Sequence, residues 1–184
     1  MSKSKIKRWQ IFSTIIVMIL GTLLHFTYEW SGPNNVVALF SAVNESVWEH
    51  LKLLFFPMLL VTIIGFILNG KYLPGYVCAS TIGIVASMLF TVFFYYIYTG
   101  IVGKDIAVVN ILSFFVSVAL GGFVTYKLMQ IPFPCCTRAS FIFLATLAIY
   151  FFIFTFCPPD LGIFKDPVSG SHGIEAAFLN WLFV

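Results

Sequence analysis

The chain has 184 residues, of which 60% are hydrophobic and 9% charged, and its mean hydropathy is +1.01. A soluble domain is about half apolar and a quarter charged. This composition therefore excludes an ordinary soluble protein and indicates an integral membrane protein. The basic residues are few, with a net charge of +3, so nucleic-acid binding is not expected.

Five continuous apolar runs are long enough to cross a bilayer, which takes about 20 helical residues. They predict spans at about 11–29, 48–69, 73–98, 106–128 and 139–157. We expect residues 1–184 to form a single integral membrane domain of the all-α class, a polytopic helical bundle. A β-barrel would require alternating apolar and polar residues, and these runs do not alternate.

The two ends of the chain differ from the five predicted spans in length or charge. The basic start MSKSKIKRW leads into an apolar run without a small-residue cleavage site, so we expect this run to stay as the first span. The C-terminal segment 172–184 would be only about 20 Å long as a helix, too short to cross the membrane. We predict a short re-entrant or interfacial helix there.

The Lys and Arg residues favour a cytoplasmic N-terminus in the cell membrane, because basic loops stay inside. In this orientation seven basic residues lie inside and three outside. All seven acids and all three histidines then fall on the outer side. The ionisable chemistry of the protein is thus predicted to face outward.

Two pairs of ionisable residues dominate this outer side. His25 and Glu29 lie four apart near the end of the first span, and Glu45 and Glu49 lie four apart at the start of the second. Residues four apart share one helix face. Ionisable groups in a span usually face the bundle interior or a wet cavity, although Glu29, beside Trp30, could instead sit at the interface.

The motif NESVWEHLK, residues 44–52, also has a purely structural explanation. Asn44 or Ser46 can cap the second span, and Ser46 with Glu49 fits the S-x-x-E capping box. That explanation leaves out His50. We therefore predict a shared polar site, for which the ligand-binding candidates are His25, Glu29, Asn44, Glu45, Glu49, His50, Asn110, Asp166 and His172.

Asn110, Asp166 and His172 are the more distant candidates. Asn110 lies one turn inside the fourth span, and the tail with Asp166 and His172 could fold back as a lid or remain a solvated loop. The row Ser113, Ser117 and Gly121 predicts close helix packing rather than a permeation path.

The four cysteines show no CxxC pair, so no redox or zinc framework is predicted. We expect inert thiols. Lipidation of the adjacent Cys135 and Cys136 is an alternative.

The blocks HFTYEWSG, VNESVWEHLKLLFFP and PPDLGIFKDPVSGSHG resemble a family of small bacterial polytopic membrane proteins of unknown function, mainly from Firmicutes. The NESVWEHLK block carries most of this resemblance. The tail matches at Pro158, Pro159, Asp166, Pro167, Ser169 and Gly170. The resemblance implies the membrane architecture and no activity.

Three functions remain open from the sequence. The first is binding or transport of a cation, a proton or a small solute at the Glu/His site. The second is an intramembrane enzyme on a lipid-like substrate, either by His/Glu acid-base chemistry or with a divalent metal ion held by His25, His50 and Glu49, or by His25, His50 and His172. The third is a structural or accessory subunit. The expected partners are membrane lipids, a small cation or solute, and another copy of the chain or a membrane partner.

Overall fold

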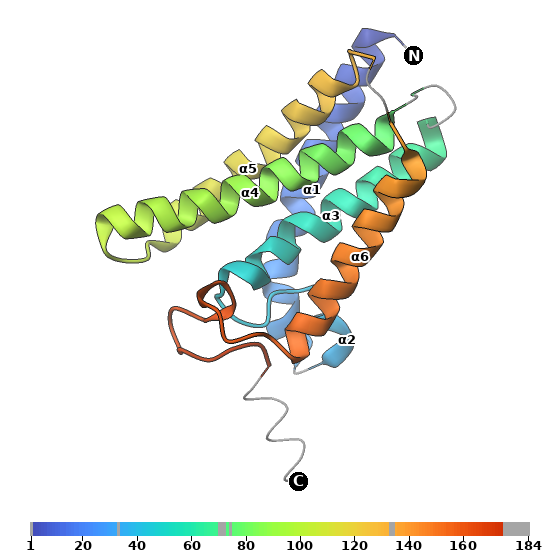
Figure 1. Ribbon diagram of the computed structural model, residues 1–184. Helices are drawn as coiled ribbons and strands as arrows, with labels where there is room; N and C mark the ends of the chain where they lie inside the picture. Colours follow the sequence, from blue (N-terminus) through green and yellow to red (C-terminus); the bar gives the residue numbers. More distant parts are fainter. Residues whose placement is uncertain (1, 33, 70–72, 74, 133–134, 175–184) are drawn as a thin grey trace.

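The computed structural model describes residues 2–32, 34–69, 73, 75–132 and 135–174. Helices and turns make up its elements (Figure 1). They are α1 (Lys3–Trp30), α2 (Asn35–Ala38), α3 (Val47–Asn69), α4 (Tyr76–Val102), α5 (Ala107–Leu128), α6 (Thr137–Phe156) and the 3-10 turn η2 (Gly162–Phe164). The all-α prediction is confirmed, and so are five long helices close to the predicted spans.

The five long helices α1, α3, α4, α5 and α6 are each long and apolar enough to cross a membrane. Large apolar side chains such as Phe12, Ile67 and Ile142 are exposed on them, as a lipid-facing surface requires. The chain is therefore a multi-pass membrane protein. α1 begins at Lys3, earlier than predicted, and its 28 residues reach about 42 Å, so the basic start continues the helix beyond the roughly 30 Å apolar core.

Helix α3 lies at the centre of the bundle. In its most apolar stretch 61% of the residues are buried, against 17–39% in the other four spans. Pro57, inside α3, has no N–H to donate to the carbonyl of Leu53. That carbonyl faces Gly21 of α1 so closely that any Cβ there would overlap it. Gly21 thus allows α1 to approach α3 one turn before His25.

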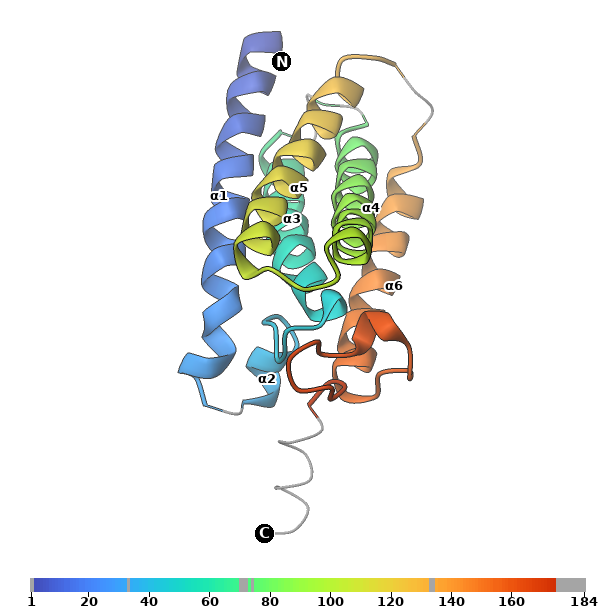
Figure 2. The same cartoon turned by 90° about the vertical axis from the view of Figure 1, so that its left-hand side faces the viewer.

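Helices α4 and α5 run side by side (Figures 1 and 2). Gly83 and Gly121 face each other at the contact, where either added Cβ would overlap the opposite backbone. The Ser87 hydroxyl donates to the carbonyl oxygen of Ser117 at 2.8 Å. The small-residue row in 113–121 is therefore a helix-packing surface, as predicted.

One expectation about the cysteines is wrong. Cys78 at the start of α4 forms a disulfide with Cys135, just before α6, across a separation of 57 residues. Cys136 and Cys157 are free and exposed. The sequence could not show this link, because it depends on how two spans meet at the end of the bundle where the chain begins.

At the opposite end, which we call the site end, the tail after α6 folds back over the start of α3 (Figure 2). Trp48 packs its ring against Phe151, Phe154 and Phe164, and the Ile174 N–H donates to the Thr155 carbonyl oxygen at 3.3 Å. Of the predicted C-terminal segment, residues 175–184 lie outside the described residues.

The α4–α5 contact yields a stability prediction. Gly121→Ala places a methyl group against the Ser87 hydroxyl and the Gly83 carbonyl oxygen, and overpacking of this kind costs about 1–3 kcal/mol. We expect a lower thermal unfolding midpoint in detergent. Gly100→Ala, which meets no atom within 4 Å, should leave the midpoint unchanged or raise it. Equal midpoints for the two variants would contradict this account of the contact.

Candidate functional site

Three side chains from three segments meet at the site end: His25 of α1, Glu45 of the loop before α3, and His50 of α3. The Glu45 carboxylate lies 3.4 Å from His50 Nε2 and 3.9 Å from His25 Nε2. The two imidazole rings are 5.3 Å apart between centroids. One potential ligand atom from each residue lies within 4.8 Å of the others. We call these three residues the His–Glu–His group.

The orientation of His50 is fixed by its own helix. Its Nδ1 lies 3.0 Å from the carbonyl oxygen of Ser46. A carbonyl oxygen only accepts, so Nδ1 carries the proton and donates it. Nε2 is then unprotonated in the neutral ring, and its lone pair faces Glu45. Histidines that bind metals are held in this way, with the other ring N–H bonded to a carbonyl or carboxylate.

The loop that carries Glu45 is anchored to α1 by Ser41. The Ser41 hydroxyl accepts from the Tyr28 N–H at 3.1 Å and donates to the carbonyl oxygen of Leu24. It is therefore inserted between two groups of the α1 backbone that lie four residues apart. This insertion joins the loop to α1 in the same helical turn that presents His25.

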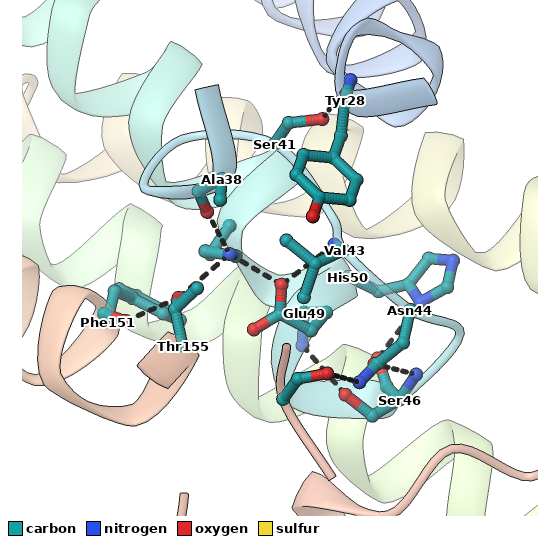
Figure 3. A network of polar contacts seen from close by, with 12 residues as sticks. Tyr28, Ala38, Ser41, Val43, Asn44, Ser46, Glu49, His50, Phe151 and Thr155 are labelled. Carbon is teal, nitrogen blue, oxygen red and sulfur yellow. Dashed lines mark hydrogen bonds and ion pairs between the residues drawn. The ribbon is translucent and has the colours of Figure 1, made fainter. Parts of the chain in front are cut away.

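A buried ion pair anchors the same loop to α3 and α6. The Lys52 ammonium lies 2.5 Å from Glu49 Oε2, and their side chains are 0% and 2% exposed. Its other donors reach the Ala38 carbonyl oxygen at 2.7 Å and Thr155 Oγ1 at 3.0 Å. Glu49 Oε2 also accepts from the Val43 N–H at 3.0 Å. Figure 3 shows this network, with Ala38 from the end of α2, Val43 from the loop and Thr155 from α6 converging on the ion pair.

Asn44 joins the loop to the tail. Its Nδ2 donates to the Gly173 carbonyl oxygen at 3.2 Å, and its Oδ1 accepts from the Ser46 N–H at 2.9 Å. Ser46 Oγ in turn accepts from the Glu49 N–H at 3.3 Å, which is the capping contact expected for the start of α3. The Glu49 carboxylate is committed to Val43 and Lys52 instead of completing the capping box.

This placement changes the predicted metal ligands. Glu45, rather than Glu49, lies with the two histidines, because Glu49 points into the protein toward Lys52. His172 is not part of the group among the described residues. Its Nε2 lies 3.5 Å from Asp160 in the tail.

The remaining candidates have separate positions. Glu29 lines a pocket beside the His–Glu–His group. Asn110 bonds to Tyr98 and Asp105 at the α4–α5 turn. Asp166 is buried and accepts from the Val168 N–H and the Ser169 hydroxyl, so it organises the turn of the tail.

Lys52 and Ser41 are two residues of this region that were not predicted from the sequence. Lys52 had a detectable signal, since it follows Glu49 by three residues and so shares its helix face. A lysine in an apolar run also requires a partner. Ser41 had no such signal, because its contacts depend on where the loop lies against α1.

Two imidazoles and one carboxylate are the protein ligands of a known class of zinc sites that keep a fourth position open. The His–Glu–His group therefore has the chemistry to hold a transition-metal ion.

Comparison with known proteins gives a family. The chain matches the model of a family of unknown function (DUF6512) over residues 1–174. The chain belongs to this family. The match agrees with the resemblance to an uncharacterised membrane protein family that the sequence suggested. No curated protein and no solved structure matches the chain.

The buried ion pair yields a second prediction. Lys52→Met leaves the Glu49 carboxylate buried without its counter-ion, which costs about 3–5 kcal/mol. We expect a large fall in the free energy of unfolding, measured by denaturant titration in detergent. Adding Glu49→Gln should recover part of it, because the uncompensated charge is gone. Lys104→Met, at an exposed position, is the control. A Lys52→Met protein as stable as this control would refute the anchoring role.

Proposed function

We propose that this protein binds a divalent transition-metal ion of the zinc class at the His–Glu–His group, and so serves as a membrane-bound cation or solute binding protein. One observation carries the proposal. His50 Nε2 and a Glu45 oxygen face each other at 3.4 Å while the His50 proton is held by Ser46. Two lone pairs facing each other repel, so a proton or a cation between them stabilises the arrangement.

The spacing supports a metal ion. Zinc lies about 2.0–2.1 Å from nitrogen and oxygen ligands, which in a tetrahedral site places two ligand atoms about 3.3 Å apart. The Glu45–His50 distance of 3.4 Å is close to this value. The Glu45–His25 distance of 3.9 Å runs from the other carboxylate oxygen, and the three ligand atoms lie within 4.8 Å of one another, so the side chains would have to rotate toward a shared ion.

The packing favours capture of the ion over free passage. Behind the site, the middle of the bundle holds a cluster of buried apolar side chains from all five long helices, among them Val17, Leu54, Ile84, Val118 and Leu144. A binding role requires access from one side only. Enzymatic use of a bound metal is the second candidate, since Glu29 shares the adjoining pocket and a carboxylate there could act as a general base.

The orientation is part of the proposal. We propose that the protein lies in the cell membrane with a cytoplasmic N-terminus and an extracytoplasmic site end. Six of the nine Lys and Arg residues that the structure describes lie at the end of the bundle where the chain begins, and such residues favour the cytoplasmic side.

Metal binding is tested on the purified full chain in detergent by titration calorimetry with Zn²⁺. We expect one ion per chain. Glu45→Gln and His50→Ala should each weaken binding by at least about 100-fold, beyond the 10–100-fold typical of an outer-shell partner. Affinity should also fall on acidification, because protons compete for the imidazoles.

The control is His172→Ala, which removes a histidine that also faces an acid but lies outside the group. It should bind zinc like the wild type. Zinc binding that survives Glu45→Gln, or that is lost equally in His172→Ala, would reject the proposed site.

Orientation is tested with the two free cysteines, which lie at opposite ends of the bundle. A membrane-impermeant maleimide added to intact cells should label Cys157 and leave Cys136 unlabelled until the cells are opened. Single Cys157→Ser and Cys136→Ser variants assign the label. The reverse pattern would place the site end in the cytoplasm.

A further inference from the structure

A pocket of about 190 Å³ adjoins the His–Glu–His group. Its lining includes two members of the group, His25 and Glu45, together with Phe26, Tyr28 and Glu29. At roughly 30 Å³ per water molecule, this volume equals about six waters. It is larger than one ion requires and smaller than the roughly 300 Å³ at which pockets for drug-sized ligands begin. The size suits a small molecule beside the ion.

Two of the three residues of the His–Glu–His group, His25 and Glu45, line this pocket. Three protein ligands leave the fourth position of a tetrahedral ion free. His25 and Glu45 line the pocket, whereas His50 does not and approaches from α3. An ion held by the three residues would therefore lie beside the pocket, with His50 on α3 away from the pocket lining. A ligand in the pocket can supply an oxygen donor to it.

The charges of the site define the rest of the ligand. A divalent ion with one carboxylate and two neutral imidazoles carries a net charge of +1. Glu29 supplies a negative charge in the same lining and lies four residues after His25, which places their Cβ atoms about 5–6 Å apart. The pocket thus has a positive pole at the ion and a negative pole at Glu29.

Aromatic rings add to the negative pole. Phe26 and Tyr28 both line the pocket, and the Phe26 ring is stacked on Trp30 at 5.7 Å between centroids. Aromatic faces attract ammonium groups. A cation in the pocket would meet the Glu29 carboxylate, with the aromatic side chains of Phe26 and Tyr28 in the same lining.

We infer that this pocket binds a small zwitterion, with an anionic oxygen on the metal ion and an ammonium group at Glu29. The inference rests on the proposed metal site and names its ligand class. Two sources share this chemistry: a free solute, or the phosphoethanolamine headgroup of a membrane lipid.

The test compares two small phosphate monoesters on the zinc-loaded full chain in detergent. O-phosphoethanolamine carries phosphate and ammonium, whereas ethyl phosphate lacks the ammonium. We expect O-phosphoethanolamine to bind about tenfold more tightly by calorimetry. Glu29→Gln should abolish this preference without changing zinc affinity. The matched control is Asp160→Asn, an acid that also faces a histidine and should keep the preference.

Zinc binding is measured first, because it distinguishes a failure of the proposed metal site from a failure of the zwitterion inference. Absent zinc binding overturns the metal site and this inference together. Normal zinc binding with equal affinity for the two probes, or a preference that survives Glu29→Gln, overturns the zwitterion inference alone.

A second comparison identifies the source of the ligand. Zinc-loaded protein is placed in nanodiscs of phosphatidylglycerol, with or without phosphatidylethanolamine. Loss of O-phosphoethanolamine binding in the discs that contain phosphatidylethanolamine means that the lipid headgroup occupies the pocket. Equal binding in both kinds of disc means a free solute.

Discussion

The ion pair between Lys52 and Glu49 is the interaction on which the site end depends. An ammonium group buried in an apolar bundle is stable only if its three protons are accepted, and here Glu49, the Ala38 carbonyl and Thr155 accept them. These acceptors come from α3 itself, from the end of α2 and from α6. The need of the Lys52 ammonium for three acceptors thereby brings three separate segments together.

The ion pair also helps to fix the loop between α2 and α3, although this loop has no regular secondary structure. Residues 39–46 connect α2 to α3, and their polar groups find partners on three sides: the Val43 N–H with Glu49, the Ser41 hydroxyl with α1, and the Asn44 side chain with the tail. A loop held by so many contacts loses little further entropy when it binds a ligand. Glu45 extends from this loop and is half exposed, so it is positioned by the loop and still reaches solvent.

The two kinds of acid at this end have different uses. Glu49 is buried against a lysine and contributes to the structure, whereas Glu45 faces two histidines and Glu29 faces a pocket. These carboxylates are all negative, so they would repel one another unless positive charges lay beside them. The lysine compensates the first carboxylate, and a bound cation would compensate the second. The buried ion pair and the His–Glu–His group thus adjoin each other, and their charged groups have different partners.

The sequence alone determined the membrane class, the five spans, the start of α3 and the gathering of acids and histidines at one end, since all of these follow from local composition and spacing. It also predicted that His25, Glu45 and His50 belong to one site. The tertiary structure decided which carboxylate joins the histidines. Because Glu45 and Glu49 lie four residues apart, the sequence placed both of them near the two histidines. In the structure Glu49 points into the protein, where it pairs with the buried Lys52. The pairing of Cys78 with Cys135 and the insertion of Ser41 into α1 were equally beyond the sequence, because both depend on distances between segments that the chain order does not specify.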